Sequence, residues 1–185
     1  MDHQFVVNII HRPELSPEYA ETALGKGKGV RDESPDIFRF QQDCAHKYGL
    51  KTTIQITYAS LFSDVIIEMA KADHETYGDE IGLSLLGLPC PEFREKYHTE
   101  DFCIWMFDEE TKAAIIDDVF GKFHEKFGFY PESTSSYFLD AYTINYIKKH
   151  YPSVKCAVAT CWEEGPKAYH TCNNSWYTFM DGGPW

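Results

Sequence analysis

The run Trp162-Glu163-Glu164 is the strongest local grouping of side chains able to do chemistry in this chain. Two carboxylates can protonate and attack a glycosidic bond, and an aromatic ring stacks on the apolar face of a sugar. A further acid, Asp140, stands between two predicted elements. We therefore predict that the catalytic acids of a glycan-cleaving site would be Glu163, Glu164 and Asp140.

Each of these acids also has a structural interpretation. An aspartate directly before a helix commonly caps it, because its carboxylate accepts hydrogen bonds from the first free N–H groups, and Asp140 fits that pattern. Glu163 and Glu164 equally fit a helix start, where acids favour the positive end of the helix dipole, beside a core tryptophan. Both interpretations stay open on the sequence.

A second set of residues is placed to bind a ligand rather than to react with it. His11 follows the first apolar segment, where imidazole serves as a base, a ligand or a hydroxyl donor, although a solvated loop histidine is the more frequent case. The predicted substrate-binding residues are Asn8, His11, Tyr137 and Trp162. No histidine pair shows H-x-x-x-H spacing and no cysteine pair shows C-x-x-C spacing, so the sequence predicts neither a metal site nor a cofactor.

Composition limits the class of protein. The chain has 185 residues, of which 43% are hydrophobic, enough for one packed domain over residues 1–185. Its net charge of −12 argues against a nucleic-acid partner, since phosphate backbones are bound by clustered lysine and arginine. No apolar run approaches the ~20 residues of a membrane span, and the first residues lack signal-peptide features. We expect a soluble chain, cytoplasmic by default, with its cysteines reduced.

Five apolar or β-branched segments alternate with helical patterns. This alternation predicts an α/β fold with a parallel sheet, whose ligand site lies at the carboxyl ends of the strands. The predicted strands lie near residues 5–10, 52–57, 80–86, 133–138 and 154–161. The candidate residues named above lie in the first, fourth and fifth of these strands or just after them.

Three segments carry a resemblance to a known superfamily. They are Asp79-Glu-Ile-Gly-Leu-Ser-Leu-Leu-Gly87, Phe127-Gly-Phe-Tyr-Pro-Glu-Ser133 and Trp162-Glu-Glu. They resemble the glycoside hydrolase/deacetylase superfamily, and within its polysaccharide deacetylase-like barrels a bacterial group of undetermined activity. The resemblance implies a partial or distorted (β/α)7 barrel and a carbohydrate ligand. Five strands would not close such a barrel, so the resemblance also implies the N-terminal part of a longer protein.

The chain departs from that family at its metal ligands. The deacetylase pattern places metal-binding histidines where this sequence has Ser84 and Leu88, and an aspartate pair where it has Asn8-Ile-Ile-His11. Three hypotheses follow. The first is a glycoside hydrolase-like enzyme that uses strand-end carboxylates, and the second is a non-catalytic carbohydrate-binding or scaffold domain on a degenerate barrel. The third, a metal-dependent polysaccharide deacetylase, requires ligands that these positions lack.

Overall fold

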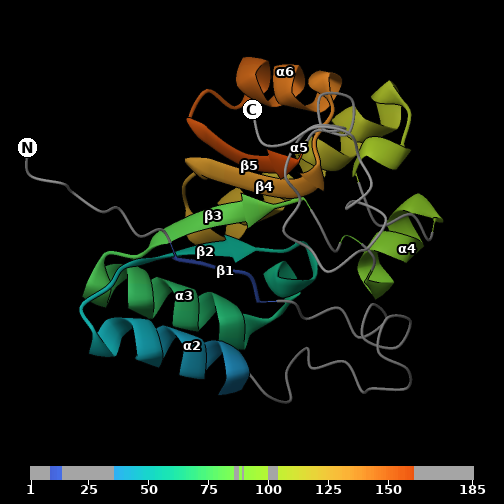
Figure 1. The fold of residues 1–185 in the computed structure, drawn as a ribbon. Helices are drawn as coiled ribbons and strands as arrows, with labels where there is room; N and C mark the ends of the chain where they lie inside the picture. The colour runs from blue at the N-terminus through green and yellow to red at the C-terminus, as the bar shows by residue number, and fades with distance from the viewer. Residues whose placement is uncertain (1–8, 14–35, 86–87, 89, 100–103, 161–185) are drawn as a thin grey trace, which may run out of the picture.

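The computed structural model describes residues 9–13, 36–85, 88, 90–99 and 104–160. Five strands alternate with five helices in the described part of the chain, and two short 3-10 helices lie between them (Figure 1). In chain order the elements are β1 (Ile9–His11), α2 (Asp36–Lys47), β2 (Thr52–Ile56), η1 (Ala59–Phe62), α3 (Asp64–Tyr77), β3 (Glu80–Ser84), α4 (Pro91–Tyr97), η2 (Ile104–Met106), α5 (Glu109–Phe127), β4 (Ser133–Phe138), α6 (Ala141–His150) and β5 (Cys156–Thr160).

The strands form one parallel sheet in the order β1-β2-β3-β4-β5. The predicted α/β class with parallel pairing is therefore confirmed, and each predicted strand overlaps an observed one. Residues 5–8, 86 and 161 of those predictions lie outside the described residues. Because each strand pairs with the next one along the chain, right-handed crossovers place the connecting helices on one face of the sheet. The sheet curls into a half-barrel, and a closed barrel is not confirmed.

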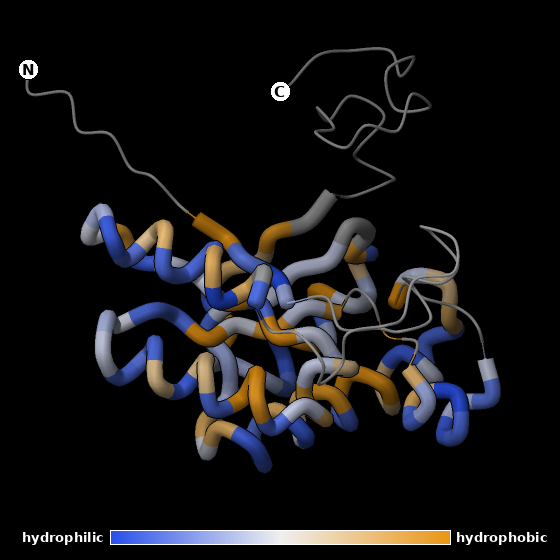
Figure 2. The backbone as a smooth tube through the Cα atoms, turned by 90° about the horizontal axis from the view of Figure 1, so that it is seen from below, coloured by the Kyte–Doolittle hydropathy of each residue, from blue (hydrophilic) through white to orange (hydrophobic). Residues whose placement is uncertain are grey.

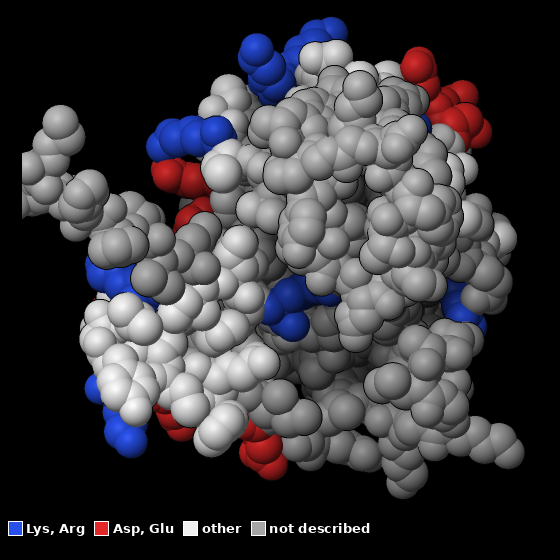
Figure 3. Space-filling view, in the orientation of Figure 1, with Lys and Arg blue, Asp and Glu red and all other residues white. Residues whose placement is uncertain are grey.

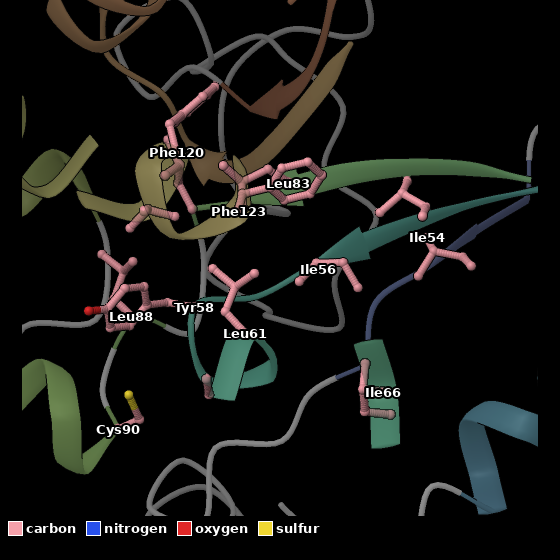
Figure 4. Close-up of a cluster of buried hydrophobic side chains, with 14 of the residues drawn as sticks. Ile54, Ile56, Tyr58, Leu61, Ile66, Leu83, Leu88, Cys90, Phe120 and Phe123 are labelled. Atoms are coloured by element: carbon pink, nitrogen blue, oxygen red, sulfur yellow. The ribbon is translucent and has the colours of Figure 1, made fainter. Parts of the chain in front are cut away.

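Side chains alternate between the two faces of this sheet. Ile54 pairs with Ile81 and Ile56 with Leu83, and these four side chains form the apolar face that packs on the helices. Figure 4 shows Ile54, Ile56 and Leu83 with Phe120 and Phe123 of α5. Each fully buried side chain of this size contributes roughly 1.5–3 kcal/mol to folding. Figure 2 shows the matching pattern on the helices, where hydrophobic and hydrophilic stretches alternate.

Helix ends follow local signals in the sequence. Helices α3 and α5 end at Gly78 (φ 73°) and Gly128 (φ 81°), in a left-handed conformation that glycine adopts without a Cβ clash. Asp108 and Asp140 begin α5 and α6, and each carboxylate accepts an N–H bond from the residue three positions on. The sequence pattern did not predict helix α4. Its one buried side chain, Phe93, leaves no helical periodicity to detect.

Candidate functional site

The carboxyl ends of the strands are the edge at which the sequence placed the ligand site. Four of the predicted site residues, Asn8, Trp162, Glu163 and Glu164, lie outside the described residues, and their roles stay predictions. The other three are described at least in their backbone: His11 ends β1, Tyr137 lies in β4, and Asp140 follows β4. These three do not form one cluster, since β2 and β3 separate β1 from β4 in the sheet.

His11 points to a helix rather than to this edge. Its Nδ1 donates a hydrogen bond to Oε1 of Gln42 on α2, and the residue pairs with Ile54 in the register of the sheet. The side chain therefore lies on the helix-covered face. It is half-buried rather than a solvated loop histidine.

Both carboxylate oxygens of Asp140 form structural contacts. Oδ1 accepts the N–H of Thr143 at 2.9 Å, which confirms the capping interpretation. Oδ2 accepts from the Thr143 hydroxyl at 3.3 Å and lies 2.7 Å from Nζ of Lys112. Lys112 is only 8% exposed, so the ion pair is largely desolvated and removal of either partner would leave an uncompensated charge. A catalytic role for Asp140 stays a prediction, and it would require this pair to open.

The end of β4 carries an irregularity next to the predicted residue Tyr137. Ser136 pairs with Ala159 and Phe138 with Thr160, so the register against β5 shifts at this point and Tyr137 is the extra residue. Such bulges re-aim side chains and occur frequently beside binding sites. The hydroxyl of Ser136 is buried and has no hydrogen-bond partner in the described structure. A buried hydroxyl without a partner is a natural contact for a ligand hydroxyl.

An exposed aromatic ring lies near the same strand. Trp105 on η2 is 48% exposed and its neighbour Met106 is 39% exposed, and η2 contacts β4. A half-exposed indole offers a flat apolar face with a polar N–H at its edge. Trp105 is not among the residues predicted from the sequence, because it falls in an aromatic segment without clear periodicity. The signal available there was the tryptophan itself, placed between a predicted strand and helix.

The end of β2 is tied to α5 by a shared carboxylate. Tyr58 and Tyr97 donate their hydroxyl hydrogen bonds to Oδ2 of Asp118 at 2.9 and 3.1 Å, and Lys96 lies 2.7 Å from Oδ1. Burial of Tyr58, and next its hydrogen bond to Asp118, hold the pKa of this phenol well above its usual range. These tyrosines remain neutral donors at ordinary pH. Asp118 on α5 therefore connects the end of β2 with α4.

A second polar cluster lies at the opposite, amino-terminal edge of the sheet. Asp79, directly before β3, is fully buried, and its Oδ1 accepts the N–H of Thr52 at the start of β2 at 2.8 Å. The sequence analysis did not count Asp79 among its site residues, because it precedes its strand. Asp79 Oδ2 also lies 2.7 Å from Nε2 of His46 and 3.0 Å from Nε2 of Gln42. The same Gln42 nitrogen donates to Asp73 Oδ2 at 3.0 Å.

This cluster is the one place in the described part of the chain where three potential metal ligands gather. One ligand atom each from His46, Asp73 and Asp79 lies within 4.8 Å of the others. Spacing rules miss it, because its members come from the end of α2, the end of α3 and the loop before β3. Only the folded sheet brings residues 46, 73 and 79 together.

Charged side chains of the described residues lie mostly around the rim of the face seen in Figure 3. Among the described helices, none combines the length and the apolar character that crossing a bilayer requires.

Comparisons of the chain with protein-family models, with curated proteins and with solved structures found no match. The case for a function therefore depends on the residues and on their arrangement.

Proposed function

We propose that this domain binds carbohydrate without cleaving it, at the carboxyl end of β4. The observation that carries the proposal is the buried Ser136 hydroxyl without a protein partner, placed at a bulge and on the strand that η2 and Trp105 approach. A sugar presents hydroxyl groups at its edges and C–H groups on its faces. A free hydroxyl and an indole ring match these two kinds of surface.

The sheet supplies the frame for this site. We propose that the half-barrel belongs to a partial or distorted (β/α)7 barrel, in which ligands lie over the carboxyl ends of the strands. The predicted ligand residue Tyr137 lies in β4 and Trp162 follows β5 in the sequence, and these two strands are neighbours in the sheet.

The hydrolase alternative rests on Glu163 and Glu164. Glycoside cleavage needs one acid that can donate a proton and a second that stays ionised. Asp140 is a poor candidate for either role, because Lys112 and Thr143 already occupy both of its carboxylate oxygens. Cleavage would therefore depend on the glutamate pair alone.

The deacetylase alternative lacks its ligands. At the positions of the family histidines, Ser84 is fully buried within the sheet and Leu88 belongs to the apolar core. Neither a hydroxyl nor an alkyl group replaces imidazole on zinc. We propose no deacetylation by this site.

Glycan binding is tested with Trp105→Ala, which removes the exposed ring. We expect the unmodified protein to bind a soluble polysaccharide from a panel in isothermal titration calorimetry. Trp105→Ala should weaken that binding by ~10-fold or more, because burying the apolar surface of one large side chain contributes about 1.5–3 kcal/mol. Phe40→Ala is the matched control. Phe40 is 68% exposed on α2, which contacts β1, the edge strand far from β4.

The result separates the hypotheses. Reducing-sugar release by the unmodified protein, abolished in Glu163→Gln, would establish the hydrolase instead. The site at β4 would be refuted if Trp105→Ala and Phe40→Ala bound the glycan equally weakly. It would also be refuted if the unmodified protein bound no glycan in the panel.

A further inference from the structure

The amino-terminal edge of the sheet carries a second site, independent of the carbohydrate proposal. His46 on the last turn of α2, Asp73 on α3 and Asp79 before β3 present an imidazole nitrogen and two carboxylate oxygens within 4.8 Å of one another. One nitrogen and two oxygens from side chains are the donor types that a divalent transition ion binds. Three elements of the fold meet at this point.

The negative charge of the carboxylates in this cluster favours a bound cation. Asp79 has no exposed side-chain surface, and the His46 side chain is only 6% exposed. In the described part of the chain neither Asp73 nor Asp79 forms an ion pair with lysine or arginine, and their neutral contacts are Gln42 and Thr52. Buried carboxylates are normally paired with a cationic side chain or coordinate a metal.

Gln42 occupies the position of a fourth ligand. Its side-chain nitrogen lies 3.0 Å from both Asp73 Oδ2 and Asp79 Oδ2. The oxygen and nitrogen of a glutamine amide are nearly the same in shape, and a half-turn of the amide exchanges them. The turned amide would direct Oε1 at the ion, while its nitrogen would face His11 and Thr52, which contact the oxygen now.

A path from solvent reaches the cluster. A hollow of about 340 Å³ lies between α2 and α3, and Gln42 and Asp73 belong both to its wall and to the cluster. Two further acids, Asp43 and Glu68, line the hollow against a single arginine, Arg39. The excess of carboxylates favours the entry of a cation. The hollow and the ligand set are separate observations that indicate the same occupant.

We propose that His46, Asp73 and Asp79, with Gln42 or water as the fourth ligand, bind one divalent transition ion of the Zn²⁺ type. Nε2 of a neutral His46 would bind the ion in place of its present bond to Asp79. Two outer contacts hold the ligands in place: the His46 ring stacks on Tyr77 at 3.6 Å, and Thr52 N–H fixes Asp79. The ion would join α2, α3 and β3 at the edge away from the glycan site. Its role is structural.

The test uses Asp73→Asn, because Asp73 is only partly buried and its loss spares the bond between Asp79 and Thr52. The purified full chain is treated with a chelator and titrated with Zn²⁺ by calorimetry, with Mg²⁺ as a comparison ion. We expect about one Zn²⁺ per chain, and an affinity at least ~10-fold lower in Asp73→Asn. Asp43→Asn, the same change in the same hollow but outside the ligand set, should bind as the unmodified protein does.

Histidine variants and a stability measurement complete the design. His46→Gln should abolish the site, whereas His124→Gln on α5 controls for adventitious binding by surface histidines. Zn²⁺, but not Mg²⁺, should raise the melting temperature of the unmodified protein, and at the same Zn²⁺ concentration it should raise that of Asp73→Asn less. Absence of stoichiometric Zn²⁺ binding, equal losses in Asp73→Asn and Asp43→Asn, or full binding by His46→Gln would overturn the proposal. Glycan binding is measured separately, so failure of one site does not decide the other.

Discussion

Gly82 shows how a single missing side chain shapes the face of the sheet opposite the apolar core. Gly82 pairs with Gln55 on β2, and the Gln55 amide donates across β3 to the Ser133 hydroxyl on β4 at 2.8 Å. A Cβ built at Gly82 would collide with both Gln55 Nε2 and Ser133 Oγ. The glycine therefore makes room for a hydrogen bond that joins the strands on either side.

We predict that Gly82→Ala destabilises the domain by about 1–3 kcal/mol, the usual range for forcing an extra methyl into a packed interior. The added carbon would break a buried hydrogen bond as well as crowd the sheet. The matched control is Gly121→Ala on α5, where the same methyl meets nothing within 4 Å. That change should stabilise the helix by roughly 0.5–1 kcal/mol.

Urea unfolding of the two variants and the unmodified protein measures both effects. Equal stability of Gly82→Ala and the unmodified protein would contradict the close packing of Gln55 and Ser133. Opposite signs for the two glycines are the expected result.

At the scale of elements, α5 connects the end of β2 with α4 and α6. Its two neighbouring acids, Asp117 and Asp118, each accept hydrogen bonds from two tyrosine hydroxyls of other elements. Those on Asp118 come from Tyr58 after β2 and Tyr97 of α4, and those on Asp117 come from Tyr146 and Tyr151 at α6. One turn of α5 therefore fixes the positions of α4, α6 and the end of β2.

We predict that Asp118→Asn destabilises the domain by roughly 1–3 kcal/mol, since hydrogen bonds to a charged group contribute about this much. The change removes the charge that Lys96 pairs with at 2.7 Å and weakens both tyrosine bonds. The control is Glu125→Gln on the same helix, which breaks an exposed ion pair with Lys122 and should cost less than ~1 kcal/mol. Thermal unfolding that shifts equally in both variants would show that Asp118 has no special role.

The sequence predicted those elements whose signals are local. Strands β2, β3 and β5 coincide with β-branched or apolar runs, and α3 and α5 end at glycines in left-handed conformation. Helix α4 was missed because seven residues with one buried side chain leave no periodic pattern.

The polar sites were harder to predict than the elements. The capping interpretation of Asp140, one of two that the sequence left open, is confirmed because its hydrogen bond spans only three residues. The cluster of His46, Asp73 and Asp79 joins residues up to 33 positions apart and depends on sheet pairing, which no short spacing encodes. The burial of the Ser136 hydroxyl without a hydrogen-bond partner depends on the packing around β4, which the sequence does not encode.

For the whole molecule, the tyrosines set the response to alkaline pH. Burial, and next a hydrogen bond to Asp117, raise the pKa of Tyr146 from 10.0 to about 12. Burial and the neighbouring aspartates likewise raise the pKa values of Tyr58, Tyr97 and Tyr151. A raised pKa in the folded state means that the unfolded chain loses its proton first. The stability that these phenols contribute is thus complete below pH 10 and is lost as pH rises toward and through the folded values.

We therefore predict cooperative unfolding above pH 10, with these four tyrosines of the twelve in the chain ionising only as the fold opens. A titration that follows tyrosinate absorbance and far-ultraviolet circular dichroism together checks this. We expect an early absorbance phase without structural change and a second phase that coincides with loss of helix signal. In Asp118→Asn the second phase should begin at lower pH, because the variant has less stability to lose. Ionisation of all twelve phenols in one early phase, with the circular dichroism unchanged, would show that the aspartate–tyrosine bonds do not hold these groups neutral.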